Sequence, residues 1–206
     1  MRNVEQLIEK IVKLFPREKF RADPFRILIC TILSQRTRDE NTEKACEKLF
    51  ARYGNVFELA RASAEDLHEL IRESGMYRQK AERIVRVARL IVERYGGKVP
   101  NTLEELLKLP GVGRKTANIV LYHGFDQPAI AVDTHVHRIS NRLGLVRTKK
   151  PEETEEELKK IVPERFWGPL NGSMVEFGRT ICLPIKPKCE VCPLNSDCEY
   201  FFQKRR

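Results

Sequence analysis

Helical periodicity constrains this chain more than any other feature of its sequence. Apolar residues recur every three or four positions over most of its length, and no segment of useful length shows the alternation typical of a strand. The segment from Phe25 to Leu33 is apolar on nearly every side and follows the capping pair Asp23 and Pro24, which predicts a central buried helix. The spacing also predicts helices over residues 3–15, 41–53, 63–75, 78–95, 151–162 and 168–181. The expected fold class is all-α.

The balance of charge points to a polyanionic partner. The 206 residues include 38 basic and 29 acidic side chains, which gives a net charge of +9. Nucleic acid is the leading candidate, because Lys and Arg side chains that contact phosphates release counterions; a basic surface that is merely solvated is the alternative. No apolar run approaches the roughly 18 residues of a membrane span, and the first residues lack the pattern of a secretory signal. We therefore expect a monomeric, cytoplasmic protein without a membrane partner.

A glycine-rich turn joins two amphipathic segments near the middle of the chain. It spans residues 109–113 with the sequence LPGVG. Glycines permit positive φ and the close approach of a ligand, and the N–H groups at the start of the next helix carry the positive end of its dipole. Gly111, Val112 and Gly113 are therefore candidates for binding a phosphate, and a simple connector between two helices is the ordinary alternative.

Two charged residues that follow the turn stand at predicted helix starts. Lys115 lies in the first turn of the next helix, where a cation opposes the helix dipole. An amine placed there, beside Arg114, gives up its proton more readily and can attack an aldehyde carbon to form a Schiff base. A lysine that only touches phosphate would fit the same position. Asp133 comes 18 residues later, before a helix expected to end at Gly144, and is a candidate N-cap whose carboxylate could also stabilise positive charge near Lys115.

Four of the six cysteines lie in the last 25 residues, at Cys182, Cys189, Cys192 and Cys198. Clustered thiols in a chain expected inside the cell favour metal binding over disulfides. Zinc takes four thiolates and would suit the close pair Cys189 and Cys192. A 4Fe-4S cluster also takes four thiolates, and the spacings of six and five residues are wide for paired zinc knuckles. Cys30, in the buried helix, fits as a small hydrophobic side chain.

Three features resemble the endonuclease III family of base-excision glycosylases with abasic-site lyase activity: the turn LPGVGRKTAN, the segment VDTHVHR and their separation. The resemblance runs from about Asp23 to Tyr200 and includes the spacing of the four cysteines, which hold a 4Fe-4S cluster in that family. It implies that Lys115 is the nucleophile that attacks C1′ of a flipped nucleotide and that Asp133 is its essential carboxylate. The implied partner is double-stranded DNA that contains an oxidised pyrimidine or an abasic site.

The same resemblance assigns contacts with DNA. The hairpin residues from Gly111 to Arg114 would grip one phosphate, and Lys186 and Lys188 would lie in a loop, held by the cluster, that contacts the DNA backbone. Met76 aligns with the leucine that the family inserts into the gap left by the extruded nucleotide. A methionine tucked into the protein core is the alternative for Met76.

A polar stretch at the end of the buried helix departs from the family pattern. By ungapped alignment, Arg36 stands where the family commonly has a glutamine that fills the space of the flipped-out base, and Gln35 comes one residue early. Both are candidate DNA contacts, with a solvated loop as the alternative. His135, two residues after Asp133, is a further candidate contact, although a histidine in a first helical turn is more often structural.

We expect two helical lobes. Residues 22–132 would form a barrel-like lobe with the hairpin, and residues 1–21 and 133–206 would form a second lobe that carries the cluster, with a DNA-binding cleft between them. Lys115 would face that cleft from the first lobe, and Asp133 would cross into the second. Two other functions remain open: a mismatch or adenine glycosylase of the same superfamily, in which this lysine is often absent, and a DNA-binding module without catalysis.

Overall fold

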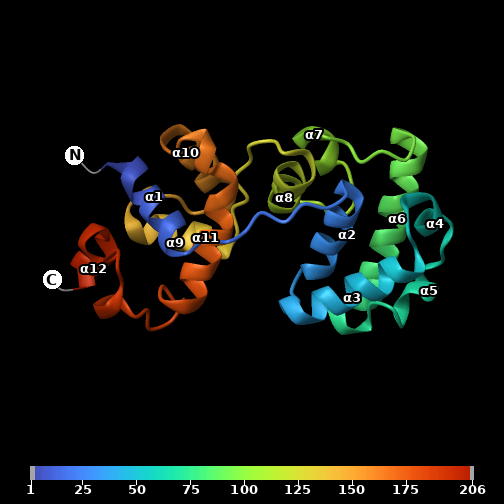
Figure 1. Cartoon of the computed structure of the whole chain (residues 1–206), viewed down its shortest axis with the longest axis horizontal. Helices are drawn as coiled ribbons and strands as arrows, with labels where there is room; N and C mark the ends of the chain where they lie inside the picture. Colours follow the sequence, from blue (N-terminus) through green and yellow to red (C-terminus); the bar gives the residue numbers. More distant parts are fainter. Residues whose placement is uncertain (1–2, 205–206) are drawn as a thin grey trace. The chain divides into compact units, whose positions relative to one another are not determined.

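Every regular element in the described part of the chain is a helix. The computed structural model describes residues 3–204, and no strand is present among them, so the all-α prediction is confirmed. Contacts divide the chain into two compact units, Met1–Phe20 with Pro128–Arg206, and Arg21–Gln127. The elements in chain order (Figure 1) are α1 (Val4–Leu14), α2 (Pro24–Ser34), α3 (Asp39–Arg52), α4 (Val56–Arg61), α5 (Ala64–His68), η1 (Arg72–Ser74), α6 (Tyr77–Tyr95), α7 (Leu103–Leu107), α8 (Arg114–Phe125), α9 (Thr134–Leu143), α10 (Pro151–Ile161), η2 (Glu164–Phe166), α11 (Trp167–Thr180), η3 (Cys189–Val191), η4 (Asn195–Asp197) and α12 (Glu199–Lys204).

The unit Arg21–Gln127 is built around the apolar helix α2. Asp23 caps this helix, as predicted, by accepting hydrogen bonds from the N–H groups of Phe25 (2.9 Å) and Arg26 (3.2 Å). Helix α2 packs against α3, α6 and α8, while α4 and α5 pack against α6 (Figure 1). Because neighbours surround α2 on several sides, most of its residues are buried, which accounts for its almost unbroken apolar sequence.

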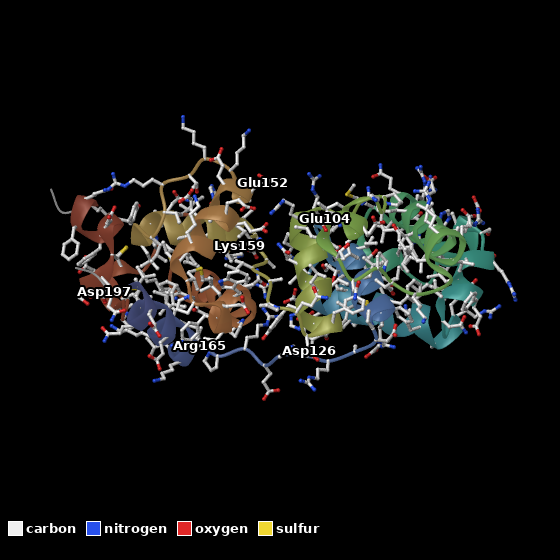
Figure 2. The ribbon with its side chains drawn as sticks, turned by 90° about the horizontal axis from the view of Figure 1, so that it is seen from above. Glu104, Asp126, Glu152, Lys159, Arg165 and Asp197 are labelled. Carbon is white, nitrogen blue, oxygen red and sulfur yellow. A yellow bond between two sulfur atoms is a disulfide. The ribbon has the colours of Figure 1, made fainter. Side chains whose placement is uncertain are left out.

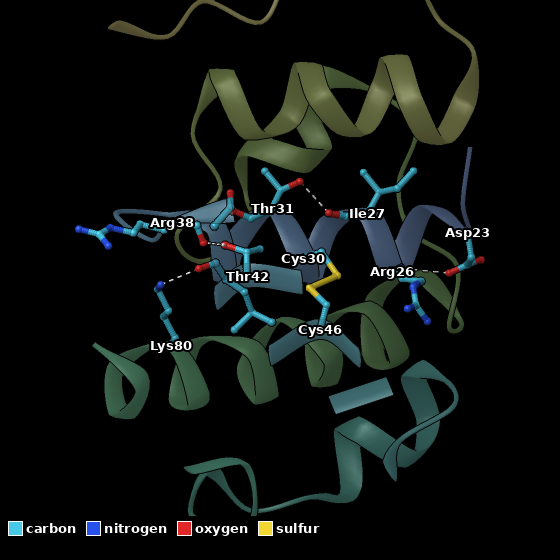
Figure 3. Close-up of a disulfide and its surroundings, with 11 residues drawn as sticks. Asp23, Arg26, Ile27, Cys30, Thr31, Arg38, Thr42, Cys46 and Lys80 are labelled. Carbon is cyan, nitrogen blue, oxygen red and sulfur yellow. Dashed lines mark hydrogen bonds between the residues drawn. A yellow bond between two sulfur atoms is a disulfide. The ribbon is translucent and has the colours of Figure 1, made fainter. Parts of the chain in front are cut away.

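A disulfide joins α2 to α3. Cys30 is half-buried and bonded to Cys46 (Figure 3), so its interpretation as a small hydrophobic side chain was wrong. The pairing depends on two helices that bring the Cα atoms within 5.7 Å of each other. Helical spacing predicts which face of each helix is inward, but it does not predict which two helices become neighbours.

One predicted helix is broken in the structure. The spacing predicted a single helix over 63–75, whereas the chain forms α5, a turn and the short helix η1. The predicted capping box at Ser63 is present, with Asp66 as its second member. The carbonyl oxygen of Ser74 accepts a hydrogen bond from Nζ of Lys80, 2.6 Å away. The break itself lies earlier, at residues 69–71, where the side chain of Ile71 is fully buried.

The second unit gathers α1, α9, α10 and α11 around one core, and α12 packs against α9 (Figure 1). Phe15 stacks on Phe177 with ring centroids 4.8 Å apart. Ile130 and Val132 lie in this core, and the side-chain amide of Asn171 donates to the carbonyl oxygen of Ala131 at 2.7 Å. Residues 128–132 therefore belong to this unit by their contacts, whereas the sequence placed them in the lobe of residues 22–132.

Charged side chains cover the surfaces of both units (Figure 2). On α10, Lys159 pairs with the buried carboxylate of Glu155 at 2.7 Å, and in the same unit Arg165 pairs with Glu5. The pair of Arg165 and Glu5 is exposed, and an exposed pair stabilises a fold only slightly because water screens it. None of the helices within residues 3–204 has the length and apolar character needed to cross a membrane.

Candidate functional site

The hairpin between α7 and α8 is anchored by two buried side chains. Leu109 and Val112 are each at most 5% exposed, so they fix the turn on the unit's core. Gly111 between them has φ of +74°, and Arg83 of α6 packs where a side chain would start: an added Cβ would lie 2.1 Å from Cδ of Arg83. Gly113 is exposed, an added Cβ there would meet nothing within 4 Å, and as the N-cap of α8 it offers no side chain of its own. An anion can therefore reach the backbone at the start of α8, where the helix dipole is positive.

Lys115 is the second residue of α8 and is half-buried. The next two residues, Thr116 and Ala117, are buried, so the backbone beneath Lys115 is fixed. Helix α8 packs closely on α2 at its other end, where an added Cβ on Gly124 would lie 3.1 Å from Cα of Pro24. The sequence placed Lys115 in the first turn of a helix directly after the glycine turn, and the structure agrees.

Asp133 caps α9, as predicted. Its Oδ1 accepts hydrogen bonds from the backbone N–H groups of His135 and Val136, each at 2.9 Å. The helix ends at the predicted Gly144, which is left-handed with φ of +75°. The two backbone bonds hold the carboxylate in one orientation at the positive end of the α9 dipole.

His135 packs inside its unit. Its Nδ1 lies 3.2 Å from Nη2 of Arg138, and an added Cβ on Gly178 of α11 would lie 2.3 Å from that same nitrogen. Burial lowers the pKa of His135, and the positive charges of Arg138 and Arg179 lower it further, while the nearby Asp133 acts in the opposite direction. The neutral imidazole is therefore favoured, and the predicted DNA contact of His135 stays a prediction.

The two polar residues at the end of α2 differ in environment. Gln35 is tied inward: its Nε2 donates to the carbonyl oxygen of Gly111 at 3.0 Å, and its Oε1 accepts from Nη1 of Arg83 at 2.9 Å. Arg36 is exposed and has a left-handed backbone, with φ of +55°. Gln35 thus joins the end of α2 to the hairpin, and Arg36 is the residue of the two that reaches solvent.

Met76 lies at the tip of a tight turn. Gly75 and Met76 both have positive φ, +61° and +46°, and the side chain of Met76 is 51% exposed. The alternative in which this methionine is tucked into the core is therefore excluded. An apolar side chain held out at a turn between η1 and α6 is available to a ligand, and its insertion into DNA stays a prediction.

The four C-terminal thiols lie along one segment beside α9. All are half-buried and carry no disulfide. Burial is the main cause that raises the pKa of Cys192, and the negative charges of Cys182, Cys198 and Cys189 raise it further. Burial likewise raises the pKa of Cys198, again with contributions from Cys182 and Cys189. A cationic group bound at these thiols would offset the burial and the repulsion that raise the pKa of Cys192 and Cys198.

The four thiols match the donor set of a 4Fe-4S cluster, which takes one thiolate at each iron. All four are half-buried in one segment and none is bound in a disulfide, so all four are available as ligands.

Two arginines of α9 organise the thiol segment, and the sequence analysis missed them. Arg142 donates through Nη1 to the carbonyl oxygen of Leu183 at 2.7 Å and through Nη2 to that of Pro184 at 2.8 Å, and its Nη1 lies 3.5 Å from Sγ of Cys182. Arg138 donates to the carbonyl oxygen of Cys182 at 2.9 Å. Their spacing of four residues puts both on one helix face, so the sequence already indicated a pair of neighbouring cations on this helix.

The loop pinned by these contacts carries two exposed cations. Lys186 and Lys188 are both exposed, and Lys186 has φ of +51°. The backbone N–H of Lys188 donates to the carbonyl oxygen of Ile181 at 3.0 Å, which closes the loop. Ile185 at its tip is 78% exposed. The loop is thus fixed at its base and presents positive charge at its surface.

Two family models match this chain. The model of HhH-GPD superfamily base excision DNA repair proteins matches residues 29–164, and the model of the iron-sulfur binding domain of endonuclease III matches residues 182–198. An endonuclease III of Thermotoga maritima is 68% identical over 198 residues, which cover 96% of this chain and 93% of the relative.

Solved structures agree with the family models. A trapped covalent intermediate of an endonuclease III with DNA, an estranged-adenine complex, is 38% identical with a TM-score of 0.88, and the match covers 97% of this chain and 95% of that one. A thermostable thymine-DNA glycosylase is 29% identical with a TM-score of 0.86 and 96% coverage of both chains. The chain therefore belongs to the endonuclease III family, within the HhH-GPD superfamily of base excision DNA repair proteins.

Proposed function

We propose that this protein is a DNA glycosylase and abasic-site lyase that removes oxidised pyrimidines from double-stranded DNA through a Schiff base on Lys115. The placement of Lys115 carries the proposal. It is a half-buried amine at the second position of α8, directly after a glycine turn whose backbone is open to a phosphate. A phosphate held at Gly113 would keep the adjoining sugar close to this amine.

The reaction balances with the amine as nucleophile. Nζ of Lys115 attacks C1′, and the bond between C1′ and the base nitrogen breaks, so the base leaves with the electron pair of that bond and takes up a proton. The amine then loses a proton, and the bond between C1′ and O4′ breaks as the iminium forms, so O4′ leaves with that electron pair and takes up a proton. Loss of a proton from C2′ then expels the 3′ phosphate by β-elimination, which cuts the strand.

Asp133 supplies the negative charge in this proposal. The leaving base and the iminium both pass through states with positive charge on the sugar, and a fixed carboxylate lowers the energy of such states. The two backbone bonds to Oδ1 hold the carboxylate so that it does not need to reorganise during the reaction. Because Lys115 and Asp133 belong to different units, their approach to one substrate is part of the proposal.

The remaining predicted contacts serve to bind and open the duplex. The hairpin from Gly111 through Val112 and Gly113 to Arg114 would hold one phosphate of the damaged strand. Met76 and Arg36, each exposed at a turn, would enter the space left by the extruded nucleotide. The lysines of the pinned loop, Lys186 and Lys188, would contact the backbone, and Gln35 and His135 would support these contacts.

The cofactor is a 4Fe-4S cluster with Cys182, Cys189, Cys192 and Cys198 as its ligands. When bound, the cluster supplies a rigid covalent anchor for the segment, and its iron charge offsets the repulsion among the four thiolates. We further propose that the protein acts as a monomer in the cytoplasm, where its DNA substrate is found.

Borohydride trapping on a duplex with a single abasic site tests the proposal. The native protein should form a covalent adduct after reduction, Lys115→Ala should form none while it still binds the duplex, and the exposed control Lys98→Ala should trap like the native protein. An adduct with Lys115→Ala would show that another amine is the nucleophile. No adduct with the native protein, despite tight binding, would indicate a glycosylase without lyase activity or a binding module.

A mismatch glycosylase is the second candidate, favoured by the similarity to a thymine-DNA glycosylase. Such an activity would release a mismatched thymine and leave the strand intact. Comparing a duplex that holds one 5-hydroxyuracil with one that holds a thymine mismatched with guanine separates the two. We expect cleavage of the oxidised base to dominate, since Lys115 is present.

A further inference from the structure

A lysine outside the proposed chemistry is almost completely buried. Lys80 on α6 is 3% exposed, and its ammonium donates three hydrogen bonds: to the carbonyl oxygens of Leu33 (2.7 Å) and Ser74 (2.6 Å) and to Oγ1 of Thr37 (2.7 Å). All three acceptors are neutral. Burial, followed by repulsion from Arg83, lowers the pKa of Lys80 to about 8. A buried ammonium without a carboxylate partner among its acceptors is unusual and needs a reason.

The three acceptors flank two turns, one that contains Arg36 and one that contains Met76. Leu33 lies in the last turn of α2, just before Arg36, and Ser74 ends η1, just before Met76. Thr37 follows Arg36, and its hydroxyl accepts from Lys80 while it donates to the carbonyl oxygen of Ser74. Figure 3 shows Lys80 reaching from α6 to the end of α2. One side chain thus joins the two turns that lie far apart in sequence.

Both turns hold a strained residue at their tips. Arg36 and Met76 have φ of +55° and +46°, in the left-handed region that side chains with Cβ seldom adopt. Such residues persist only where surrounding contacts fix them, and they cluster where a ligand is gripped. The three bonds of Lys80 supply that restraint to both turns at once.

We propose that Lys80 is a positioning residue for base extrusion: it holds the turns of Arg36 and Met76 in one fixed arrangement, so that both side chains enter the duplex together. The inference rests on the proposed function, in which these side chains fill the space of the extruded nucleotide. It assigns Lys80 no bond to substrate, because its three acceptors and its burial close it off from the solvent.

The proposal predicts a selective defect. Release of a damaged base from a duplex requires extrusion of a stacked nucleotide, whereas an abasic site has no base to unstack. A lesion in a single strand has no partner strand to leave. Loss of Lys80 should therefore slow base release from duplex DNA more than cleavage at an abasic site or release from single-stranded DNA.

Lys80→Met tests this with a side chain of similar length but without donors. Single-turnover rates would be measured on a duplex with one 5-hydroxyuracil, on the same oligonucleotide as a single strand, and on a duplex with one abasic site. We expect about a tenfold or greater loss on the damaged duplex, since hydrogen bonds from a charged donor are lost, and changes within about twofold on the other two. Lys48→Met, which removes an exposed lysine paired with Glu73 of η1, is the matched control and should retain all three rates.

Equal losses on all three substrates would overturn the proposal, because they would reveal a general role in folding. Unchanged rates on all three would overturn it as well. Thr37→Val provides a second variant if Lys80→Met does not fold: it leaves the ammonium in place, removes the bridge between the turns, and should show the same selectivity to a smaller extent. If the native protein neither releases the base nor cuts the abasic site, the result contradicts the proposed function, which distinguishes it from a failure of the Lys80 proposal.

Discussion

A matched pair of glycine-to-alanine changes in the hairpin separates what the turn needs to fold from what it needs to bind. Gly111 has φ of +74°, and an added Cβ would lie 2.1 Å from Cδ, 2.3 Å from Nε and 2.7 Å from Cζ of Arg83. Gly113, two residues along, has φ of −95°, and its added Cβ would meet nothing within 4 Å. The two changes are chemically identical, so their difference isolates the local structure.

The expected magnitudes follow from those contacts. In Gly111→Ala the left-handed backbone costs about 1 kcal/mol for a residue with Cβ. Arg83 must also move away, which breaks its 2.9 Å bond to Gln35 and costs about 1 kcal/mol more. We expect the free energy of unfolding to fall by about 2 kcal/mol. In Gly113→Ala it should stay within about 0.5 kcal/mol of the native value, or rise slightly, because alanine has fewer unfolded conformations to lose.

Binding should follow a different order. The Cβ of Gly113→Ala would occupy the space through which a phosphate approaches the start of α8, so this stable variant should bind duplex DNA with an abasic-site analogue at least about tenfold more weakly. Denaturant unfolding would measure stability, and fluorescence anisotropy would measure affinity at one fixed salt concentration. A Gly113→Ala protein that is as unstable as Gly111→Ala, or that binds DNA like the native protein, would refute this reasoning.

Three further predictions concern other parts of the chain. Reduction of the Cys30–Cys46 disulfide, or Cys46→Ser, should lower the free energy of unfolding by about 3 kcal/mol, because the bond closes a loop between residues 16 positions apart. Calorimetry with and without reductant checks this, and equal melting temperatures would contradict it. The purified protein should be yellow-brown with about four irons per chain, and Cys192→Ser should lose iron and colour, whereas colourless native protein with stoichiometric zinc would exclude the cluster. The pKa of Lys80 is about 8 in the folded chain against 10.5 ordinarily, so from pH 8 to 10.5 the unfolded chain keeps a proton that the folded chain has lost. Unfolding free energy should therefore rise with pH in that window relative to Lys80→Met, by about 3 kcal/mol at most, and parallel pH profiles for the two proteins would show that this pKa is not lowered.

The features predicted correctly from the sequence are those that depend on neighbouring residues. Asp23 and Asp133 were expected to cap α2 and α9, and both do, because a cap depends only on the next two or three residues. Lys115 was expected just after the glycine turn for the same reason. The break between α5 and η1 was missed, because the helical spacing of Leu67, Leu70 and Ile71 continues across it.

Contacts between distant segments left no mark in the sequence. Cys30 and Cys46 are 16 residues apart, and nothing in their neighbourhood indicates that α2 and α3 lie side by side. Gln35 was predicted only as a DNA contact, and its bonds to Gly111 and Arg83 within the same unit were not predicted. A polar residue at the end of a buried helix looks the same whether its partner is a ligand or another loop of the same unit.

Helix α6 shows most clearly why such contacts matter. Lys80 and Arg83 are three residues apart, so they share one face of the helix. Lys80 bonds to the turns that carry Arg36 and Met76, and Arg83 reaches the hairpin through Gln35 and through close packing on Gly111. In the sequence both cations look like part of a solvated charged face, because helical spacing does not distinguish a buried ammonium from an exposed one.

Stability alone does not account for a buried Lys80. Keeping it charged at pH 7 costs about 3 kcal/mol, from the difference between its pKa of about 8 and its ordinary 10.5. The ammonium connects separate segments, because its three donors bond to Leu33, Thr37 and Ser74 at once. An apolar side chain of equal volume would bury as well but would leave the two left-handed tips without a common restraint, which is why we place the role of Lys80 in base release.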